Sequence, residues 1–295
     1  MRAYRFVTVD VFTDRRFGGN PLAVFPDARG LSDAEMQALA AEFNLSETTF
    51  VLPPEDPAHT ARVRIFNRQS EMPFAGHPNV GTGFLLAQEG HDREGRLAFE
   101  EIAGLVEVVV ERDAAGTVRG ATIAAPQPLS LGTRFEAGPI AACAGLEATA
   151  IRTGGHPPIQ AGTGNHFVIA EVAPEALARA RPDAGAFRQI AAEHPALEGR
   201  VALYLYAREE NGDRARMFAP LHGTEEDPAT GSAATSLAAL LLSLSSEAAA
   251  RLDIRQGVEM GRPSLLRTTA RRAADGIHAT VGGGCVPVLR GEALL

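Results

Sequence analysis

The chain has 295 residues, of which 45% are hydrophobic and 22% charged, and its formal net charge is −8. This composition is globular, and the length suits two domains of roughly 100–200 residues each. All 28 basic residues are arginines, which excludes a lysine Schiff base, a pyridoxal-phosphate enzyme and a P-loop, and a negative chain without a basic run predicts no nucleic-acid partner.

The sequence also bears on where the chain acts. The segment Met1–Phe6 has no long apolar stretch, and the longest apolar run, Leu237–Leu242, is too short to span a bilayer. Cys143 and Cys285 show neither a CxxC nor a zinc-ligand spacing. We therefore expect a reducing, cytoplasmic location with no signal peptide and no membrane partner.

The first helix has clear start and stop signals. Ser32 and Glu35 form a capping box, the apolar residues between Met36 and Phe43 recur at helical spacing, and Asn44 suits a left-handed stop. Segments that alternate polar and apolar residues, or are rich in β-branched and aromatic residues, predict strands at 48–52, 62–66, 105–111, 118–124, 201–207 and 214–218.

Two further helices differ from ordinary surface helices. Residues 79–88 and 228–244 carry no charge, and a helix that is apolar or small on every side is usually buried. We expect these helices to begin at or near Pro78 and Pro228, with Asp227 at the N-cap of the second. Each half of the chain is thus predicted to wrap a sheet around one central helix.

An internal repeat supports this division. Residues 62–66 read Arg-Val-Arg-Ile-Phe, and residues 214–218, which lie 152 positions later, read Arg-Ala-Arg-Met-Phe. An acidic loop is expected after each strand, with Glu71 in one and Glu225–Asp227 in the other, and a glycine-containing helix start follows. This recurrence predicts a duplicated unit of about half the chain.

A weaker match lies upstream, where residues 19–24 resemble residues 164–169. The alternative explanation for both matches is chance similarity between short strands. The breaker cluster at 126–128 marks a boundary. We expect an N-terminal half over 1–126, completed by a C-terminal strand at about 280–295, and a C-terminal half over 127–279, with the active site in the cleft between them.

The helix starts predict an anion site. Free N–H groups and a partial positive charge lie at a helix N-terminus, and glycine lets a ligand approach that backbone closely. Gly76 and Gly231 would therefore suit a substrate carboxylate and negative charge developing on it. The alternative is that these glycines only permit tight helix packing. Ser232 either donates to the carboxylate or caps its own backbone.

Several titratable residues near these turns are candidates to move a proton: Glu47, Glu71, His77, His222, Glu225, Glu226 and Asp227. Glu47 lies beside an apolar strand, which favours the neutral carboxyl and brings its pKa toward the working pH. A solvated surface glutamate is the alternative. His77 either polarises a carbonyl and relays a proton or is a packed, capping histidine.

Metal and nucleotide sites are not predicted. The eight histidines are scattered without a His-x-x-x-His or Glu-x-x-His pair. The clusters Gly81-Thr82-Gly83 and Gly282-Gly283-Gly284 do not extend to a strand–GxGxxG–helix unit. We therefore expect no metal and no cofactor.

Six motifs together resemble the phenazine-biosynthesis PhzF-like isomerases. They are Asp10-Val11-Phe12-Thr13, Gly19-Asn20-Pro21-Leu22-Ala23-Val24, Ser46-Glu47-Thr48-Thr49-Phe50-Val51, Pro73-Phe74-Ala75-Gly76-His77-Pro78, Glu226-Asp227-Pro228-Ala229-Thr230-Gly231-Ser232-Ala233, and Gln256-Gly257 through Gly261-Arg262-Pro263-Ser264. They occur in order over nearly the whole chain, and together they are highly specific.

The resemblance implies the α+β, diaminopimelate-epimerase-like fold, in which two pseudo-symmetric halves each curl a mixed sheet around a central helix. It implies a cofactor-independent proton shift within a dihydro-hydroxyanthranilate-like acid, and commonly a homodimer. Glu47 would be the proton shuttle, with His77 and Asp227 assisting. The substrate would be bound by Asn20, Gly76, Gly231 and Ser232.

The resemblance also has departures. Related amino-acid epimerases use one thiol from each half, whereas the positions before the two helices here carry Ala75 and Pro228. Asn67-Arg68 replaces a common Thr-Pro, and Asn79 stands where threonine is usual, which leaves the substrate open.

Our hypothesis is therefore an isomerase that moves a proton on carbon of a small carboxylate, with Glu47 as the single base. One alternative is an epimerase or racemase on the same scaffold, which would need a second base on the opposite face. The other is a non-catalytic carboxylate-binding or regulatory protein.

Overall fold

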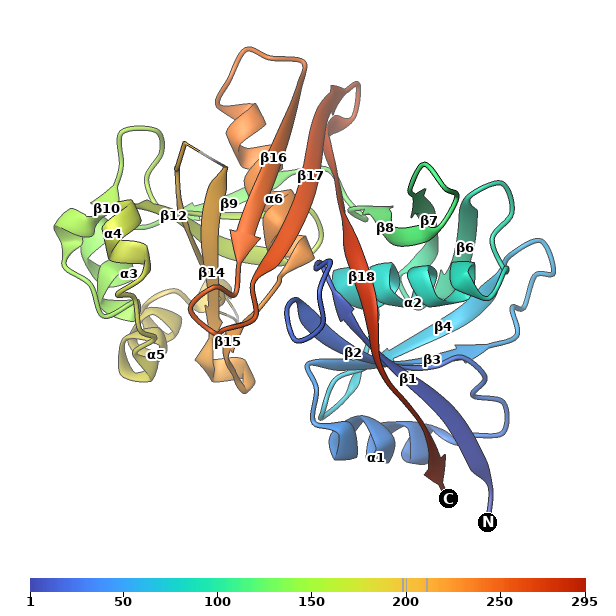
Figure 1. Cartoon of the computed structure of the whole chain (residues 1–295). Helices are drawn as coiled ribbons and strands as arrows, with labels where there is room; N and C mark the ends of the chain where they lie inside the picture. Colours follow the sequence, from blue (N-terminus) through green and yellow to red (C-terminus); the bar gives the residue numbers. More distant parts are fainter. Residues whose placement is uncertain (198, 200, 211) are drawn as a thin grey trace. The chain divides into compact units, whose positions relative to one another are not determined.

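The computed structural model describes residues 1–197, 199, 201–210 and 212–295 of the chain (Figure 1). The chain divides into two compact units. Unit 1 comprises Met1–Pro126 and Val281–Leu295, and unit 2 comprises Gln127–Thr280. The last strand, β18 (Gly276–Leu294), begins in unit 2 and ends in unit 1.

Unit 1 is a closed barrel around a helix. Its elements are β1 (Ala3–Val11), β2 (Asn20–Phe25), α1 (Asp33–Phe43), β3 (Glu47–Leu52), β4 (Ala61–Phe66), β5 (Glu71–Met72), α2 (Gly76–Gln88), β6 (Arg96–Glu101), β7 (Gly104–Arg112) and β8 (Val118–Ala124). Pairing runs β1–β2–β3–β4–β6–β7–β8–β18 and returns to β1, so this ring has no open edge. The β2–β3 and β4–β6 pairs are parallel, and the β1–β2, β3–β4, β6–β7, β7–β8 and β1–β18 pairs are antiparallel.

Helix α2 fills this barrel. Every residue from Gly76 to Ala87 is buried, which confirms the prediction made from the absence of charge. Close approach of the strands depends on two glycines of the helix. A Cβ atom on Gly81 would lie 2.7 Å from side-chain atoms of Leu22 and Val11, and one on Gly83 would lie 2.6 Å from Val108. Gly81 and Gly83 thus allow the strands to pack closely against α2.

Helix α1 covers the outer face of β3. Its capping box of Ser32 and Glu35 and its left-handed end at Asn44 are both as predicted. Phe50 belongs to the apolar cluster under α1, whereas the Thr49 hydroxyl meets the Thr82 hydroxyl of α2 at 2.8 Å. Because side chains alternate along a strand, odd positions of β3 face the barrel interior.

Unit 2 repeats this plan. Its elements are β9 (Ser130–Arg134), α3 (Ala137–Cys143), η1 (Ala148–Ala150), β10 (Ile151–Arg152), β11 (Ile159–Gly162), β12 (His166–Val172), α4 (Pro174–Leu177), α5 (Ala184–Glu193), η2 (Pro195–Leu197), β13 (Leu203–Ala207), β14 (Asp213–Ala219), η3 (Pro220–His222), β15 (Thr224–Asp227), α6 (Gly231–Ser243), β16 (Ala249–Gln256) and β17 (Ser264–Ala273). Ten residues of α6 are buried, as the uncharged segment predicts.

The two units share one order of strand pairing. In unit 1, β3 is parallel to β2 and antiparallel to β4, while β4 is antiparallel to β5 and parallel to β6. In unit 2, β13 is parallel to β12 and antiparallel to β14, while β14 is antiparallel to β15 and parallel to β16. The predicted pseudo-symmetric α+β fold is therefore confirmed.

Three details of the prediction were wrong. The expected acidic loops are short strands, β5 and β15, because each turns back to pair with the strand before it. Helix α6 begins at Gly231, three residues after Pro228, and its N-cap is Thr230 rather than Asp227. The reason is that Asp227 still belongs to β15, where it pairs with Met217. Strand β13 begins at Leu203 rather than 201. Within the described residues, no helix is both long and apolar enough to cross a membrane.

Candidate active site

Glu47 lies on the interior face of the barrel of unit 1. It is the first residue of β3, and its partner in the parallel register with β2 is Leu22. Leu22 contacts α2 through Gly81, and Thr49, two residues after Glu47, also faces α2. The Glu47 side chain is 16% exposed. The strand alternation therefore directs this carboxylate toward the helix.

His77 is the partner of Glu47 in the first turn of α2. Its side chain is 6% exposed, and its Nε2 atom lies 3.4 Å from Oε2 of Glu47. Burial lowers the pKa of His77 to about 3, so the imidazole is neutral near pH 7. Because a carboxylate only accepts hydrogen bonds, this contact favours the tautomer with its proton on Nε2. The predicted pair is thus brought together.

The first turn of α2 also presents backbone donors. Its N-cap is Ala75, which has no side chain to cap the helix, and Gly76 is its first residue. N–H groups of a first turn have no intrahelical acceptor, and the helix dipole is positive there. Asn79, which is fully buried, donates from Nδ2 to the Ala75 carbonyl at 3.1 Å. This turn can therefore stabilise negative charge beside Glu47 and His77.

Asn20 lies on the same face of β2. It is fully buried and precedes Leu22, the partner of Glu47, by two positions, so its side chain is directed to the same side. The preceding Gly19 has a φ of +64°, and a Cβ there would lie 2.3 Å from the Val11 carbonyl oxygen. Only glycine fits this turn into β2.

In unit 2, Asp227 ends β15 and is 8% exposed. The Thr230 hydroxyl donates to Oδ2 of Asp227 at 2.5 Å. Gln256 donates from Nε2 to the Asp227 carbonyl at 2.8 Å and to Oγ1 of Thr230 at 3.0 Å, and its Oε1 accepts from the Thr230 N–H at 3.2 Å. Asp227 is therefore held in a fixed orientation next to the start of α6.

Gln256 was not among the predicted site residues, although it begins the last of the six motifs. That motif, residues 256–264, contacts the loop from Asp227 to Thr230 that precedes α6. The Ser264 hydroxyl donates to the Pro228 carbonyl at 2.8 Å, and a Cβ on Gly257, whose φ is +73°, would lie 2.6 Å from the same oxygen. The motif is therefore a scaffold for the Asp227 loop, and its spacing alone did not indicate this.

Gly231 and Ser232 begin α6. Gly231 is buried and Ser232 is half-buried. The Ser232 carbonyl accepts from the hydroxyls of Thr235 at 2.9 Å and Ser236 at 2.7 Å. The side chain of the N-cap residue, Thr230, makes no capping hydrogen bond to the backbone of α6.

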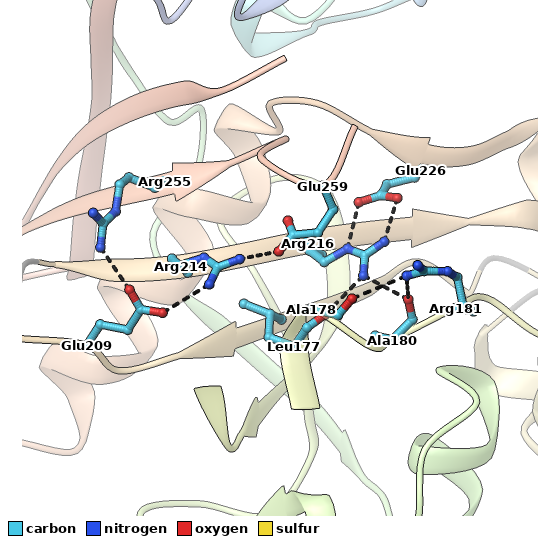
Figure 2. Close-up of polar contacts among 10 residues, drawn as sticks. All are labelled: Leu177, Ala178, Ala180, Arg181, Glu209, Arg214, Arg216, Glu226, Arg255 and Glu259. Atoms are coloured by element: carbon cyan, nitrogen blue, oxygen red, sulfur yellow. Dashed lines mark hydrogen bonds and ion pairs between the residues drawn. The ribbon is translucent and has the colours of Figure 1, made fainter. Parts of the chain in front are cut away.

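Two acidic candidates are paired with arginine instead. Glu71 accepts from Nε and Nη2 of Arg64 at 2.7 and 2.6 Å. Glu226 accepts from Nε and Nη2 of Arg216 at 2.8 Å each (Figure 2). A bidentate pair with arginine occupies both oxygens of each carboxylate, so neither group suits proton transfer. His222 and Glu225 are exposed.

The remaining residues singled out from the sequence have structural contacts. Asn67 accepts at Oδ1 from the N–H groups of Gln69 and Ser70 at 2.7 and 2.8 Å, which forms the turn before β5. Cys143 and Cys285 are both buried, and burial raises the pKa of the Cys143 thiol to about 12. Neither cysteine lies in the first turn of α2 or α6.

Glu101 is a buried acid that the sequence did not indicate. Both its carboxyl oxygens are buried, and its polar neighbour is the Asn79 amide of α2. Burial raises the pKa of Glu101 to about 8, so it is mostly protonated at neutral pH. A Glu-Glu pair at a strand end is typical of a solvated surface, and nothing in the local sequence distinguishes Glu101 from Glu100.

A family model described as "Phenazine biosynthesis-like protein" matches residues 9–291. An uncharacterized isomerase of Mesorhizobium japonicum is 38% identical over 302 residues, which cover 99% of both chains. A trans-2,3-dihydro-3-hydroxyanthranilate isomerase of Pseudomonas chlororaphis is 36% identical over 99% of this chain and 100% of its own. The crystal structure of a Bacillus anthracis phenazine biosynthesis protein of the PhzF family covers both chains fully with a TM-score of 0.88 at 24% identity, which shows the fold.

Proposed function

The chain belongs to the phenazine biosynthesis-like protein family and is an isomerase, and from this premise we propose that it shifts a proton between carbon atoms of a small carboxylic acid with Glu47 as the acid and base. The observation that carries the proposal is the contact between Glu47 and a neutral His77 at the first turn of α2. No cofactor takes part in the proposed reaction.

The proposed steps follow from the chemistry of these groups. The Glu47 carboxylate removes a proton from a carbon conjugated with an unsaturated or carbonyl group, which leaves a delocalised anion. The backbone N–H groups of Gly76 and His77 in the first turn of α2 stabilise that anion. The protonated Glu47 then returns the proton to another carbon of the same anion, so atoms and charge balance and the product is an isomer.

We propose that the other predicted residues hold the substrate. Asn20 and the first-turn groups at Gly231 and Ser232 suit a carboxylate, since they offer amide, backbone and hydroxyl donors. Asp227, oriented by Thr230 and Gln256, suits a positively charged or hydroxyl group. The relative from Pseudomonas chlororaphis is named for trans-2,3-dihydro-3-hydroxyanthranilate, and we propose a chemically similar acid as the substrate.

Deuterium incorporation tests this function. We would incubate the protein with trans-2,3-dihydro-3-hydroxyanthranilate and a panel of unsaturated amino acids and hydroxy acids in D2O, and follow product mass and chirality. The wild type should form the isomer and incorporate up to one deuterium per turnover, because the proton held on Glu47 can exchange with D2O before it is returned. Glu47→Gln should lose at least about 10²-fold in rate, because the acid–base group is gone. Glu107→Gln, an exposed glutamate of β7, is the matched control.

Two results would contradict the proposal. If Glu47→Gln exchanges as fast as wild type, Glu47 is not the base. If the wild type exchanges deuterium but inverts one stereocentre without moving unsaturation, the chain is an epimerase. Exchange that is lost in Glu47→Gln and kept in Glu107→Gln supports the assignment.

A further inference from the structure

Arg216 joins three segments of unit 2. It lies on β14, its side chain is 3% exposed, and both Nε and Nη2 donate to Glu226 of β15. Its Nη1 atom donates to the carbonyls of Leu177 at 3.0 Å and Ala180 at 2.8 Å, at the end of α4 (Figure 2). Glu226 directly precedes Asp227. This guanidinium therefore ties β14 and the α4 region to the residue next to Asp227.

Arg64 makes the corresponding contacts in unit 1. It lies on β4, and Nε and Nη2 donate to Glu71 of β5, while Nη1 donates to Asp33 at 2.6 Å. Asp33 is the first residue of α1. Hydrogen bonding to Glu71 raises the pKa of Arg64 above its ordinary value, as expected for a paired guanidinium. Each arginine thus links its own strand to the short strand that follows it, β5 or β15. It also contacts the connection between two parallel strands, which contains α1 in unit 1 and α4 in unit 2.

The spacing to the site is the same in both units. Glu71 lies five residues before Gly76, the first residue of α2, and Glu226 lies five residues before Gly231, the first residue of α6. Each arginine also lies over the ring of the phenylalanine two residues later on its strand, with distances from the guanidinium carbon to the ring centroid of 5.1 Å for Phe66 and 4.9 Å for Phe218.

The short strands β5 and β15 have few backbone pairings, although Gln256 also holds the Asp227 end of β15. β5 pairs with β4 at two positions only, and β15 pairs with β14 at two positions separated by a register shift. So few ladder positions define the direction of a strand poorly. A bidentate guanidinium–carboxylate pair fixes both distance and orientation, and it is therefore suited to set where the following helix begins.

We propose that Arg64–Glu71 and Arg216–Glu226 are positioning pairs, which hold the first turn of α2 with His77 and the Asp227 loop before α6 in their working geometry. The effect on rate rests on the proposed function, whereas the effect on local order does not. These residues act through the backbone and do not contact the substrate. Their loss should therefore lower turnover more than substrate affinity.

The chain offers a matched control on each strand. Arg62 and Arg214 precede Arg64 and Arg216 by two residues, and they pair with acids outside β5 and β15. We would compare Arg216→Lys with Arg214→Lys and Arg64→Lys with Arg62→Lys, since lysine keeps the charge but not the bidentate geometry. Glu226→Gln adds a milder variant in case Arg216→Lys does not fold.

Two measurements decide the outcome. Amide hydrogen exchange should rise about tenfold or more over residues 224–232 in Arg216→Lys and over 71–77 in Arg64→Lys, with the control variants unchanged. In the deuterium-incorporation assay, kcat should fall on the order of 10–10²-fold while KM changes less than about threefold.

Equal local exchange in the test and control variants would overturn the proposal, whether or not a substrate has been found. So would a fall in rate that follows only the fraction of unfolded protein. Failure of wild-type turnover alone would contradict the proposed function and leave the exchange measurement to decide this inference.

Discussion

The imidazole of His77 limits what the site can do. With its pKa lowered to about 3 by burial, it is neutral at every pH where the protein is expected to work. The contact with Glu47 is then a neutral donor facing a carboxylate rather than an ion pair. The single group that gains and loses a proton in the proposed reaction is therefore Glu47, and we propose that the His77 imidazole orients it.

Glu101 provides a pH-dependent prediction at the same scale. Its pKa is raised from 4.5 to about 8 by burial, so the folded state keeps a proton that the unfolded chain releases. Stability then falls as pH rises from about 4.5 to about 8, by at most roughly 1.4 kcal/mol per pH unit. Glu101→Gln removes this dependence, so its stability relative to wild type should increase steadily across this range in denaturant titrations.

Glu100 is the neighbouring control for that experiment. Backbone N–H groups of Glu55 and Asp56 and the His59 side chain lower the pKa of Glu100 to about 2. Its own linkage therefore acts below pH 5, so Glu100→Gln should lack the steady stability change between pH 5 and 8 that is expected for Glu101→Gln. A constant offset for Glu101→Gln would show that Glu101 is ionised in the folded protein.

At the scale of elements, the two central helices depend on small side chains. Gly81→Ala should destabilise the protein by about 1–2 kcal/mol, because a Cβ 2.7 Å from Leu22 and Val11 overpacks a filled barrel by more than helix propensity regains. Gly138→Ala in α3 meets no atom within 4 Å and should stabilise by about 0.5 kcal/mol. Thermal unfolding of both variants checks this, and two changes of the same sign would contradict it.

The elements that the sequence predicted well have local causes. The capping box of Ser32, the left-handed Asn44 and the uncharged segments of α2 and α6 are all visible within a few residues. β5 and β15 are not, because strands of two and four residues are too short to show a periodicity. The same limit applies to Glu101, whose burial depends on the neighbouring helix α2.

Among the site residues, too, some could be predicted from the sequence and others could not. Glu47 and His77 lie in different motifs of the sequence, and the register of β2 with β3 directs Glu47 toward α2, where the two side chains meet. Gln256 was not predicted as a site residue, because its contacts with Asp227 and Thr230 join segments about thirty residues apart. Long-range hydrogen bonds of this kind follow from topology rather than from any local pattern.

At the scale of the whole molecule, β18 closes the barrel of unit 1. It pairs with β1 over nine positions and with β8 on its other side. The β8–β18 contact is a close approach of two backbones, because a Cβ on Gly120 would lie 1.9 Å from the Gly283 carbonyl oxygen. Neither backbone can move aside without opening the ring. Disrupting this contact therefore tests whether each unit unfolds cooperatively and independently of the other.

Gly120→Ala should therefore destabilise unit 1 by about 3 kcal/mol, more than Gly81→Ala, where side chains can adjust. Amide hydrogen exchange should rise in β1, β7, β8 and the part of β18 after residue 280, while β12, β13 and β16 of unit 2 keep their protection. Equal loss of protection in both units would mean that they unfold together. Protection lost in unit 1 alone would show that the duplicated halves of this isomerase are separate folding units, each stabilised by its own central helix.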